Sequence, residues 1–119
     1  MPKIFESEYR FCLLLWEKEP IKSSELVALC KEKLGWKPTT TYTVIKKCIE
    51  KGAIERQEPN FLCHACITKE AAQREEADAL LDKVFGGSAE LLFASVLSGR
   101  KLKKEELDRL RALVEAQEA

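Results

Sequence analysis

The sequence predicts a mainly α-helical protein with one small β-hairpin, followed by a further helical region. Two observations carry this prediction. Apolar residues recur at helical spacing through most of the chain, and one pair of short extended segments flanks a proline–asparagine turn. A change to charged composition near residue 68 divides the chain, so we expect one domain over residues 1–67 and a second region over residues 68–119.

The overall composition fits a small protein with a real core. The chain has 119 residues, 45% of them hydrophobic, which argues against extensive disorder. No apolar run approaches the roughly 20 residues needed to span a bilayer. The N-terminal residues lack the apolar run and cleavage site of a signal peptide. We therefore expect a cytoplasmic protein with no membrane partner.

The first helix is expected over residues 7–19, because Pro20 pushes the residue before it out of the helical region. Its inner face is expected to hold Tyr9, Cys12, Leu13, Leu15 and Trp16. Ile21 then stands as a lone apolar residue between turn-like neighbours.

A second helix is expected over residues 24–34. Ser23 or Ser24 can cap its start, and Gly35 is well placed as its C-terminal stop. Neither serine has Glu or Gln three residues later, so no capping box is expected. The residues expected to face inward are Leu26, Val27, Leu29 and Cys30.

The third helix begins at Pro38, where proline is tolerated in a first turn, and ends at Lys51-Gly52. Its pattern is strongly two-sided. One stripe holds Thr41, Val44, Ile45, Cys48 and Ile49. The opposite face holds Thr39, Thr40, Thr43, Lys46, Lys47 and Glu50.

Two short extended segments follow, residues 53–58 and 61–67, around the turn Pro59-Asn60. Proline is acceptable at the tip, outside the hydrogen-bonded ladder. Three helices followed by a hairpin predict a winged helix-turn-helix.

The outer face of the third helix is typical of a DNA-recognition helix. Hydroxyls at its N-terminal end suit base edges, and the lysines behind them suit phosphates. We expect Thr39, Thr40 and Thr43 to face bases, and Lys37, Lys46 and Lys47 to meet phosphates. Tyr42 is expected to stack on a sugar or pack at the rim.

Contacts with the DNA backbone are expected from the start of the second helix, near Ser23 and Ser24, and from Arg56 and Asn60 in the hairpin, which forms the wing. A capping cluster of threonines on a surface helix is the alternative, although one cap needs only one hydroxyl.

Charge distribution supports the same interpretation despite a net charge of zero. Residues 1–67 hold 11 Lys/Arg against 9 Asp/Glu, and residues 68–119 hold 9 against 11. Residues 31–51 hold six lysines against two glutamates, so positive charge gathers around the third helix. A lysine-rich solvated helix face would give the same local balance.

Three amphipathic helices are expected after residue 68, over about 69–85, from a cap at Ser88 to Gly99, and over about 103–116. About fifty residues form too small a core to be stable alone. We expect a second copy of the chain to cover their apolar faces, and folding back on the first domain is the alternative. The expected dimer interface comprises Leu80, Leu81, Val84, Phe85, Leu91, Leu92, Phe93, Val96, Leu97, Leu107, Leu110, Leu113 and Val114.

The five cysteines do not indicate a secreted disulfide framework. Three of them, Cys12, Cys30 and Cys48, lie on apolar stripes and are expected in the core. Cys63, His64 and Cys66 are candidate metal ligands, but Cys63 would face the opposite side of a strand from the other two, so we expect no metal and no cofactor. With one histidine and no acid pair or phosphate loop beside it, we expect no enzyme activity.

The chain resembles the penicillinase-repressor family of bacterial transcription regulators (the BlaI/MecI/CopY type). The resemblance rests on Trp16, on the run Trp36-Lys37-Pro38-Thr39-Thr40-Thr41-Tyr42-Thr43-Val44-Ile45, on Lys51-Gly52-Ala53-Ile54 and on the later run from Leu80 to Gly87. It implies a dimeric winged-helix repressor that binds a palindromic operator, with base contacts from Thr40 and Thr43. Relatives often carry lysine where this chain has Thr39, so its operator is expected to differ.

Two departures concern the inducing signal. The resemblance places the Asn-Phe bond, at which the β-lactam-responsive repressors are cleaved, near Ser95-Val96, so the same protease is not expected to act here. The copper-responsive members carry C-terminal cysteine pairs, and this chain has no cysteine after Cys66. The inducer or protease therefore stays unidentified.

We therefore expect a homodimeric repressor that binds double-stranded DNA through the helix starting at Pro38. Two other classes are alternatives. One is a winged-helix protein-interaction module, which the neutral net charge favours. The other is a thiol- or metal-responsive sensor that uses Cys63 and Cys66.

Overall fold

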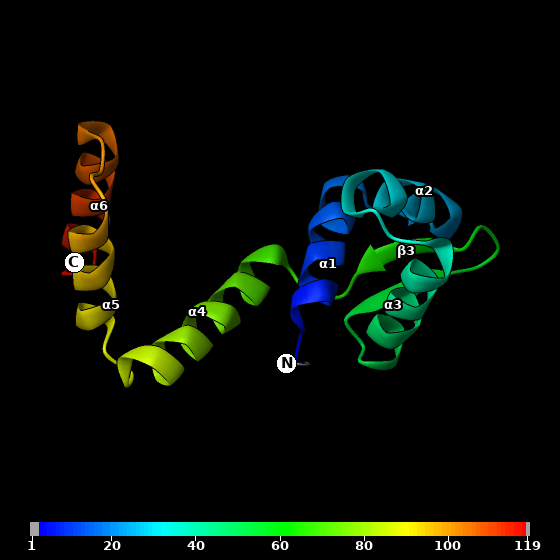
Figure 1. The fold of residues 1–119 in the computed structure, drawn as a ribbon, viewed down its shortest axis with the longest axis horizontal. Coiled ribbons are helices and arrows are strands. Elements are labelled where there is room, and N and C mark those ends of the chain that lie inside the picture. The colour runs from blue at the N-terminus through cyan, green and yellow to red at the C-terminus, as the bar shows by residue number, and fades with distance from the viewer. Residues whose placement is uncertain (1–2, 119) are drawn as a thin grey trace. The chain divides into compact units, whose positions relative to one another are not determined.

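The computed structural model describes residues 3–118 and contains six helices and three short strands in that range (Figure 1). In chain order these are α1 (Glu6–Lys18), β1 (Ile21–Lys22), α2 (Ser23–Leu34), α3 (Pro38–Glu50), β2 (Ile54–Gln57), β3 (Leu62–Ala65), α4 (Lys69–Phe85), α5 (Ala89–Gly99) and α6 (Lys104–Ala116). The predicted fold class, mainly α with a small β-element in a winged helix-turn-helix, is confirmed.

The described part of the chain divides into two compact units, with the boundary between Glu75 and Glu76. The first unit includes the start of α4, where Ala72 is 3% exposed. The Trp16 indole contributes to this packing, because its Nε1–H donates to the carbonyl oxygen of Ile67 at 3.1 Å. The role of each part of the chain stays a prediction.

The wing is a three-stranded antiparallel sheet rather than a two-stranded hairpin. Its strand order is β1-β3-β2, with Ile21 opposite Cys63 and Glu55 opposite His64. Treating Ile21 as a lone apolar residue was therefore wrong. Two residues between Pro20 and a helix carry too short a pattern to predict a strand, but the exposed edge of β3 gives them a hydrogen-bonding partner.

The core of the first unit lies where α1, α2, α3 and the sheet meet. Its buried apolar residues are Ile4, Phe11, Cys12, Leu15, Ile21, Leu26, Cys30, Val44, Ile45, Cys48, Ala53, Ile54 and Cys63. Burial of Cys12, Cys30 and Cys48 was predicted. Phe11 was missed, although it is fully buried, and Leu13 is only half-buried. The inward face of α1 is therefore rotated slightly from the predicted one.

The two faces of α3 separate as the sequence predicts. Thr41, Val44, Ile45 and Cys48 are buried against the core, and Ile49 is half-buried. The Thr41 hydroxyl is buried and forms no well-aligned hydrogen bond among the described residues, although it lies close enough to the Cys30 thiol to lower the pKa of that thiol. Such a group costs about 1–3 kcal/mol of stability.

A buried ion pair joins the start of α1 to the end of α3. Glu8 is 2% exposed, and its Oε1 accepts hydrogen bonds from the backbone N–H of Phe5, at 2.8 Å, and from Lys51 Nζ. The same Nζ donates to the Lys3 carbonyl at 2.9 Å and lies 4.0 Å from the centroid of the Phe5 ring. Lys51 therefore neutralises a carboxylate that water hardly reaches. Apolar periodicity does not predict this pair, because its two members lie 43 residues apart in the chain.

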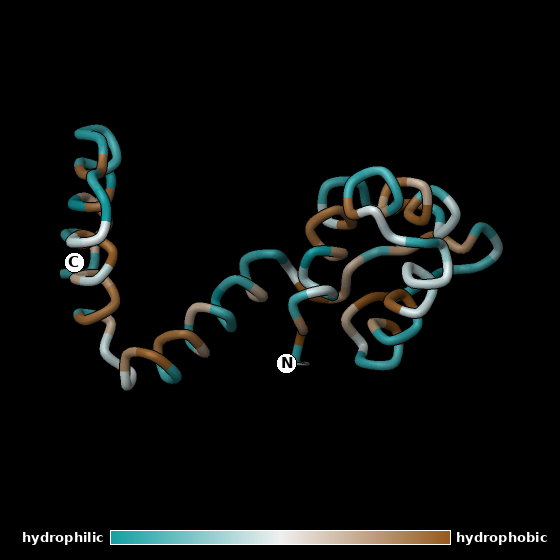
Figure 2. Tube along the Cα trace, viewed as in Figure 1, coloured by the Kyte–Doolittle hydropathy of each residue, from teal (hydrophilic) through white to brown (hydrophobic). Residues whose placement is uncertain are grey.

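The second unit exposes much of its apolar surface. No residue of α5 or α6 is buried, although both helices are fully described. Figure 2 shows hydrophobic stretches recurring along α4, α5 and α6. The expected cap of α5 is present, since the Ser88 hydroxyl accepts from the Leu91 N–H at 3.1 Å. These helices form as predicted, and their apolar faces remain uncovered within one chain.

Within residues 3–118, no helix combines the length and the apolar character required to cross a membrane.

Replacing Thr41 with valine should stabilise the protein. The change removes a buried hydroxyl whose only polar neighbour of note is the weakly bonding Cys30 thiol, and it keeps nearly the same shape, so the free energy of unfolding should rise by about 1 kcal/mol. Urea denaturation of the two proteins measures this difference. The control Thr40→Val changes an exposed position and should shift stability by less than about 0.5 kcal/mol. Equal effects of the two changes would contradict the inward assignment of Thr41.

Replacing Lys51 with methionine should destabilise the protein. Loss of the cation leaves the Glu8 carboxylate buried and unpaired, which costs about 3 kcal/mol, the lower end of the usual range, because the Lys51 side chain is 24% exposed. Thermal or urea unfolding measures the loss. The double variant Glu8→Met with Lys51→Met should recover most of it, and Lys18→Met, at an exposed site, should change little. A Lys51→Met protein as stable as the parent would show that the pair has no structural importance.

Candidate DNA-binding surface

The candidate surface is the outward face of α3, which we define as Thr39, Thr40, Thr43, Lys46 and Lys47. All five side chains are exposed. The opposite stripe of the helix is buried, so the packing of α3 fixes which residues face solvent. The face combines hydroxyls in the first two turns with two ammonium groups one turn later.

The start of α3 is set by its backbone. Lys37 is the N-cap in an extended conformation and Pro38 occupies the first turn, where a missing N–H costs nothing. The positive end of the helix dipole therefore lies beside the threonines. Lys37 is exposed there, and the Tyr42 side chain is 46% exposed next to the same face.

The Thr43 hydroxyl has a defined orientation. It donates to the backbone carbonyl oxygen of Thr39 at 2.8 Å, one turn earlier in the same helix. Its hydrogen is thus directed at the helix backbone, and its oxygen lone pairs are left to accept. Toward a ligand, Thr43 is therefore an acceptor.

The start of α2 differs from the prediction. The helix begins at Ser23 with Lys22 as N-cap, and no side chain caps it, so the expected serine cap was wrong. Ser23 is 7% exposed, and its N–H donates to the Phe61 carbonyl at 3.0 Å. The Ser23 N–H is therefore already hydrogen-bonded to the wing and, contrary to the prediction, is not free to bind a phosphate. Ser24 is exposed at the same helix end.

The wing presents both of its predicted residues to solvent. Arg56 and Asn60 are exposed, and the Arg56 guanidinium lies 5.3 Å from the centroid of the Phe61 ring. Phe61 has φ of +51° and is 46% exposed at the tip. Stacking on this ring reduces the freedom of the Arg56 side chain and holds its charge near the tip of the wing.

Of the six lysines counted around α3, one is not available for a partner. Lys51 is engaged with buried Glu8, so its charge is neutralised inside the first unit. Lys37, Lys46 and Lys47 remain exposed on or beside α3, and Lys31 and Lys33 are exposed on α2. Five of the six lysines counted in the sequence therefore remain exposed to solvent, and only the charge of Lys51 is lost.

Four of the thiols, those of Cys12, Cys30, Cys48 and Cys63, are buried in the core. The pKa of Cys12 is raised, first by its hydrogen bond with Cys48 and then by burial, while the same bond lowers the pKa of Cys48. Burial raises the pKa of Cys30 and of Cys63. Cys63 also lies with its Sγ 3.8 Å from the Phe61 carbonyl oxygen. It therefore does not belong to a ligand set with His64 and Cys66.

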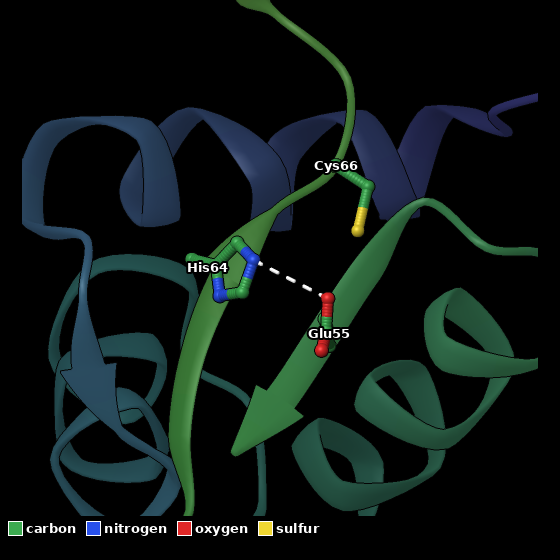
Figure 3. A group of neighbouring side chains, drawn as sticks. All are labelled: Glu55, His64 and Cys66. Atoms are coloured by element: carbon green, nitrogen blue, oxygen red, sulfur yellow. Dashed lines mark ion pairs between the residues drawn. The ribbon is translucent and has the colours of Figure 1, made fainter.

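His64 and Cys66 instead approach Glu55, a residue that the pattern within one strand does not single out. Single-strand alternation separates Cys63 from His64 and Cys66, as predicted, but it cannot show which residue lies across the ladder. That residue is Glu55, on β2 directly opposite His64. The three side chains converge on one face of the wing (Figure 3).

The match to known proteins extends over nearly the whole chain. A family model described as the penicillinase repressor matches residues 4–116. The chain belongs to the penicillinase-repressor family. This confirms the resemblance drawn from the third-helix motif and from the run after Leu80.

Individual relatives agree with the family match. The penicillinase repressor of Bacillus licheniformis is 20% identical over 117 residues, which is 97% of this chain and 91% of that protein. The solution structure of the DNA-binding domain of the repressor BlaI matches 57% of this chain and 85% of its own, at 23% identity and a TM-score of 0.54. The monomeric form of B. licheniformis BlaI in complex with the blaP half-operator matches 58% of this chain and 87% of its own, at 22% identity and a TM-score of 0.51. At these identities the two structures show a common fold.

Proposed function

We propose that the protein is a homodimeric transcriptional repressor that binds double-stranded DNA through α3. The observation that carries this proposal is the division of α3 into a buried stripe and an exposed face of threonines and lysines. Family membership supports it, as does the similarity to BlaI, which forms a complex with a half-operator. Under this proposal, residues 1–67 bind DNA and residues 68–119 form the dimer.

The hydroxyl groups of the surface contact bases and determine specificity, and its ammonium groups contact phosphates and position the helix. Thr39, Thr40 and Thr43 face base edges in the major groove. Because the Thr43 hydrogen is directed at the Thr39 carbonyl, Thr43 accepts from the exocyclic amino group of adenine or cytosine. Lys37, Lys46 and Lys47 meet phosphates, which carry affinity but no direct sequence information.

Flanking elements supply further contacts. Ser24 at the start of α2 and Tyr42 at the edge of α3 lie beside the duplex, and Arg56 and Asn60 in the wing contact its backbone. Ser23 is left out of this set because its N–H pairs with Phe61. Its role is to attach α2 to the wing.

The proposed dimer follows from the uncovered apolar side chains of the second unit. Leu91, Leu113 and Val114 are 57, 66 and 63% exposed. Other members of the expected interface are also exposed: Leu80, Val84, Phe93, Val96, Leu97 and Leu107. Leu81, Phe85, Leu92 and Leu110 are half-buried. Full burial stabilises by about 1.5–3 kcal/mol for each such side chain, so covering this surface with a second copy is strongly favoured.

Twofold symmetry then determines the form of the operator. Two identical recognition helices related by a twofold axis read two inverted half-sites, so the target is a palindrome. The half-sites lie about one helical turn, or slightly more, apart.

Changing the threonines should alter specificity, and changing a lysine should alter affinity for every duplex. The variant Thr40→Ala with Thr43→Ala should lose about 1–3 kcal/mol of discrimination for each base contact removed. The variant Lys47→Ala should weaken binding to all duplexes and flatten the salt dependence by about one unit. Fluorescence-anisotropy titrations at several salt concentrations measure both effects, using a duplex selected by the protein from random sequence and a scrambled duplex.

Lys18→Ala is the matched control, since Lys18 is exposed at the end of α1, outside the proposed surface. It should bind as the parent does. If neither α3 variant changed either titration, α3 would not be the recognition element. If the parent bound no duplex at all, a winged-helix protein-interaction module would replace this proposal.

Charged substitutions in the second unit should dissociate the dimer. Leu91→Lys with Val114→Lys places four ammonium groups, two from each copy, in the proposed apolar interface. Sedimentation equilibrium should then show a monomer at concentrations at which the parent is a dimer. Glu90→Lys with Glu115→Lys introduces the same side chains at neighbouring exposed positions and should leave the dimer intact. Dimers of equal stability for both variants would place the interface elsewhere.

A further inference from the structure

Three potential metal ligands meet on the exposed face of the wing. One donor atom from each of Glu55, His64 and Cys66 lies within 4.8 Å of the others, and His64 Nε2 is 3.5 Å from Glu55 Oε2. Figure 3 shows the thiol directed toward the carboxylate and the imidazole. The backbone pairing of the sheet brings these three side chains together.

The backbone contacts explain why these residues meet. Glu55 and His64 are directly opposed on β2 and β3, so their side chains share one face. Cys66 follows β3 and continues the ladder, because its N–H donates to the Ala53 carbonyl at 2.8 Å. Each of the three is thus anchored by the sheet, and only side-chain rotations are needed to bring the donors closer.

We propose that Glu55, His64 and Cys66 form a binding site for a zinc-class divalent metal ion, with water as the fourth ligand. An imidazole nitrogen, a thiolate and a carboxylate are the donors that Zn²⁺ accepts, and three protein ligands with an open position are common for this ion. Tetrahedral bonds of about 2.0–2.3 Å place such donors about 3.3–3.8 Å apart. The His64–Glu55 distance already lies in that range.

The surroundings favour a cation there. The Glu19 carboxylate accepts from the Ala65 N–H at 2.7 Å, which holds another negative charge beside the cluster. The negative charges of Glu19 and Glu55 attract a divalent cation to this face of the wing.

Exposure distinguishes Cys66 from the other four cysteines, which are all buried in the core. His64 is half-buried and Glu55 is exposed, so an ion can enter directly from solvent and keep a water ligand. A bound metal ion would link Glu55 on β2 to Cys66 in the segment between β3 and α4. The same segment is held on its other side by the bond from Trp16 Nε1 to the Ile67 carbonyl.

Metal titration of the full chain tests the site without any DNA. Under reducing conditions, Zn²⁺ should bind with one ion per chain in competition with a chromophoric chelator. Co²⁺ should give the near-ultraviolet charge-transfer absorption of a thiolate ligand. Cys66→Ser should abolish that absorption, and both Cys66→Ser and His64→Gln should weaken Zn²⁺ binding by more than about tenfold.

Glu58→Gln is the matched control, since it removes a neighbouring exposed carboxylate that is not part of the cluster. It should bind Zn²⁺ within about twofold of the parent. Equal affinity in the parent and in Cys66→Ser, the absence of a thiolate band, or one ion for every two chains would overturn the proposed site. Because no duplex is present, these results are independent of the proposed repressor function.

Discussion

The structure depends first on how α3 is rotated about its own axis. Thr41, Val44, Ile45 and Cys48 bury one side of the helix, and that burial alone determines which groups point outward. A rotation by one residue, about 100°, would bring Lys46 or Lys47 into the core, at a cost comparable with the whole stability of about 5–15 kcal/mol. The threonine and lysine face is therefore a consequence of core packing, and the surface can vary in chemistry without a change in its position.

Secondary contacts hold α3 within the first unit. The Glu8–Lys51 pair fixes its C-terminal end to the start of α1, and the bond from Ser23 to Phe61 attaches α2 to the wing. The second unit contrasts with this arrangement. Its helices form from local signals such as the Ser88 cap, but they cover little of one another's apolar surface. The first unit has a closed apolar core, whereas α5 and α6 contain no buried residue.

The sequence predicted features that depend on local or periodic signals. The bounds of α4, the Ser88 cap and the inner stripe of α3 all follow from spacing within a single segment. The features that the sequence did not predict involve residues far apart in the chain. Strand β1 forms by pairing with the edge of β3, and buried Glu8 is neutralised by Lys51. Glu55 lies near Cys66 only because β2 and β3 are paired. The serine cap predicted for α2 is also absent: Lys22 is the N-cap, and the Ser23 N–H pairs with the Phe61 carbonyl of the wing. The exposed residues of α3 and their chemistry could be predicted from the spacing within the helix, and their contacts with DNA are a proposal.

The most direct test of the account uses the threonine methyl groups of α3 as probes in NMR. Thr39, Thr40 and Thr43 face outward, while Thr41 on the same helix faces the core and Thr68 precedes α4. A protein labelled at threonine methyls is bound to a duplex that it has selected from random sequence, and intermolecular methyl-to-DNA contacts are measured. Such contacts are expected for Thr39, Thr40 and Thr43, and none is expected for Thr41 or Thr68. The absence of contacts from all three outward threonines in a saturated complex would contradict the assignment of α3 as the recognition helix.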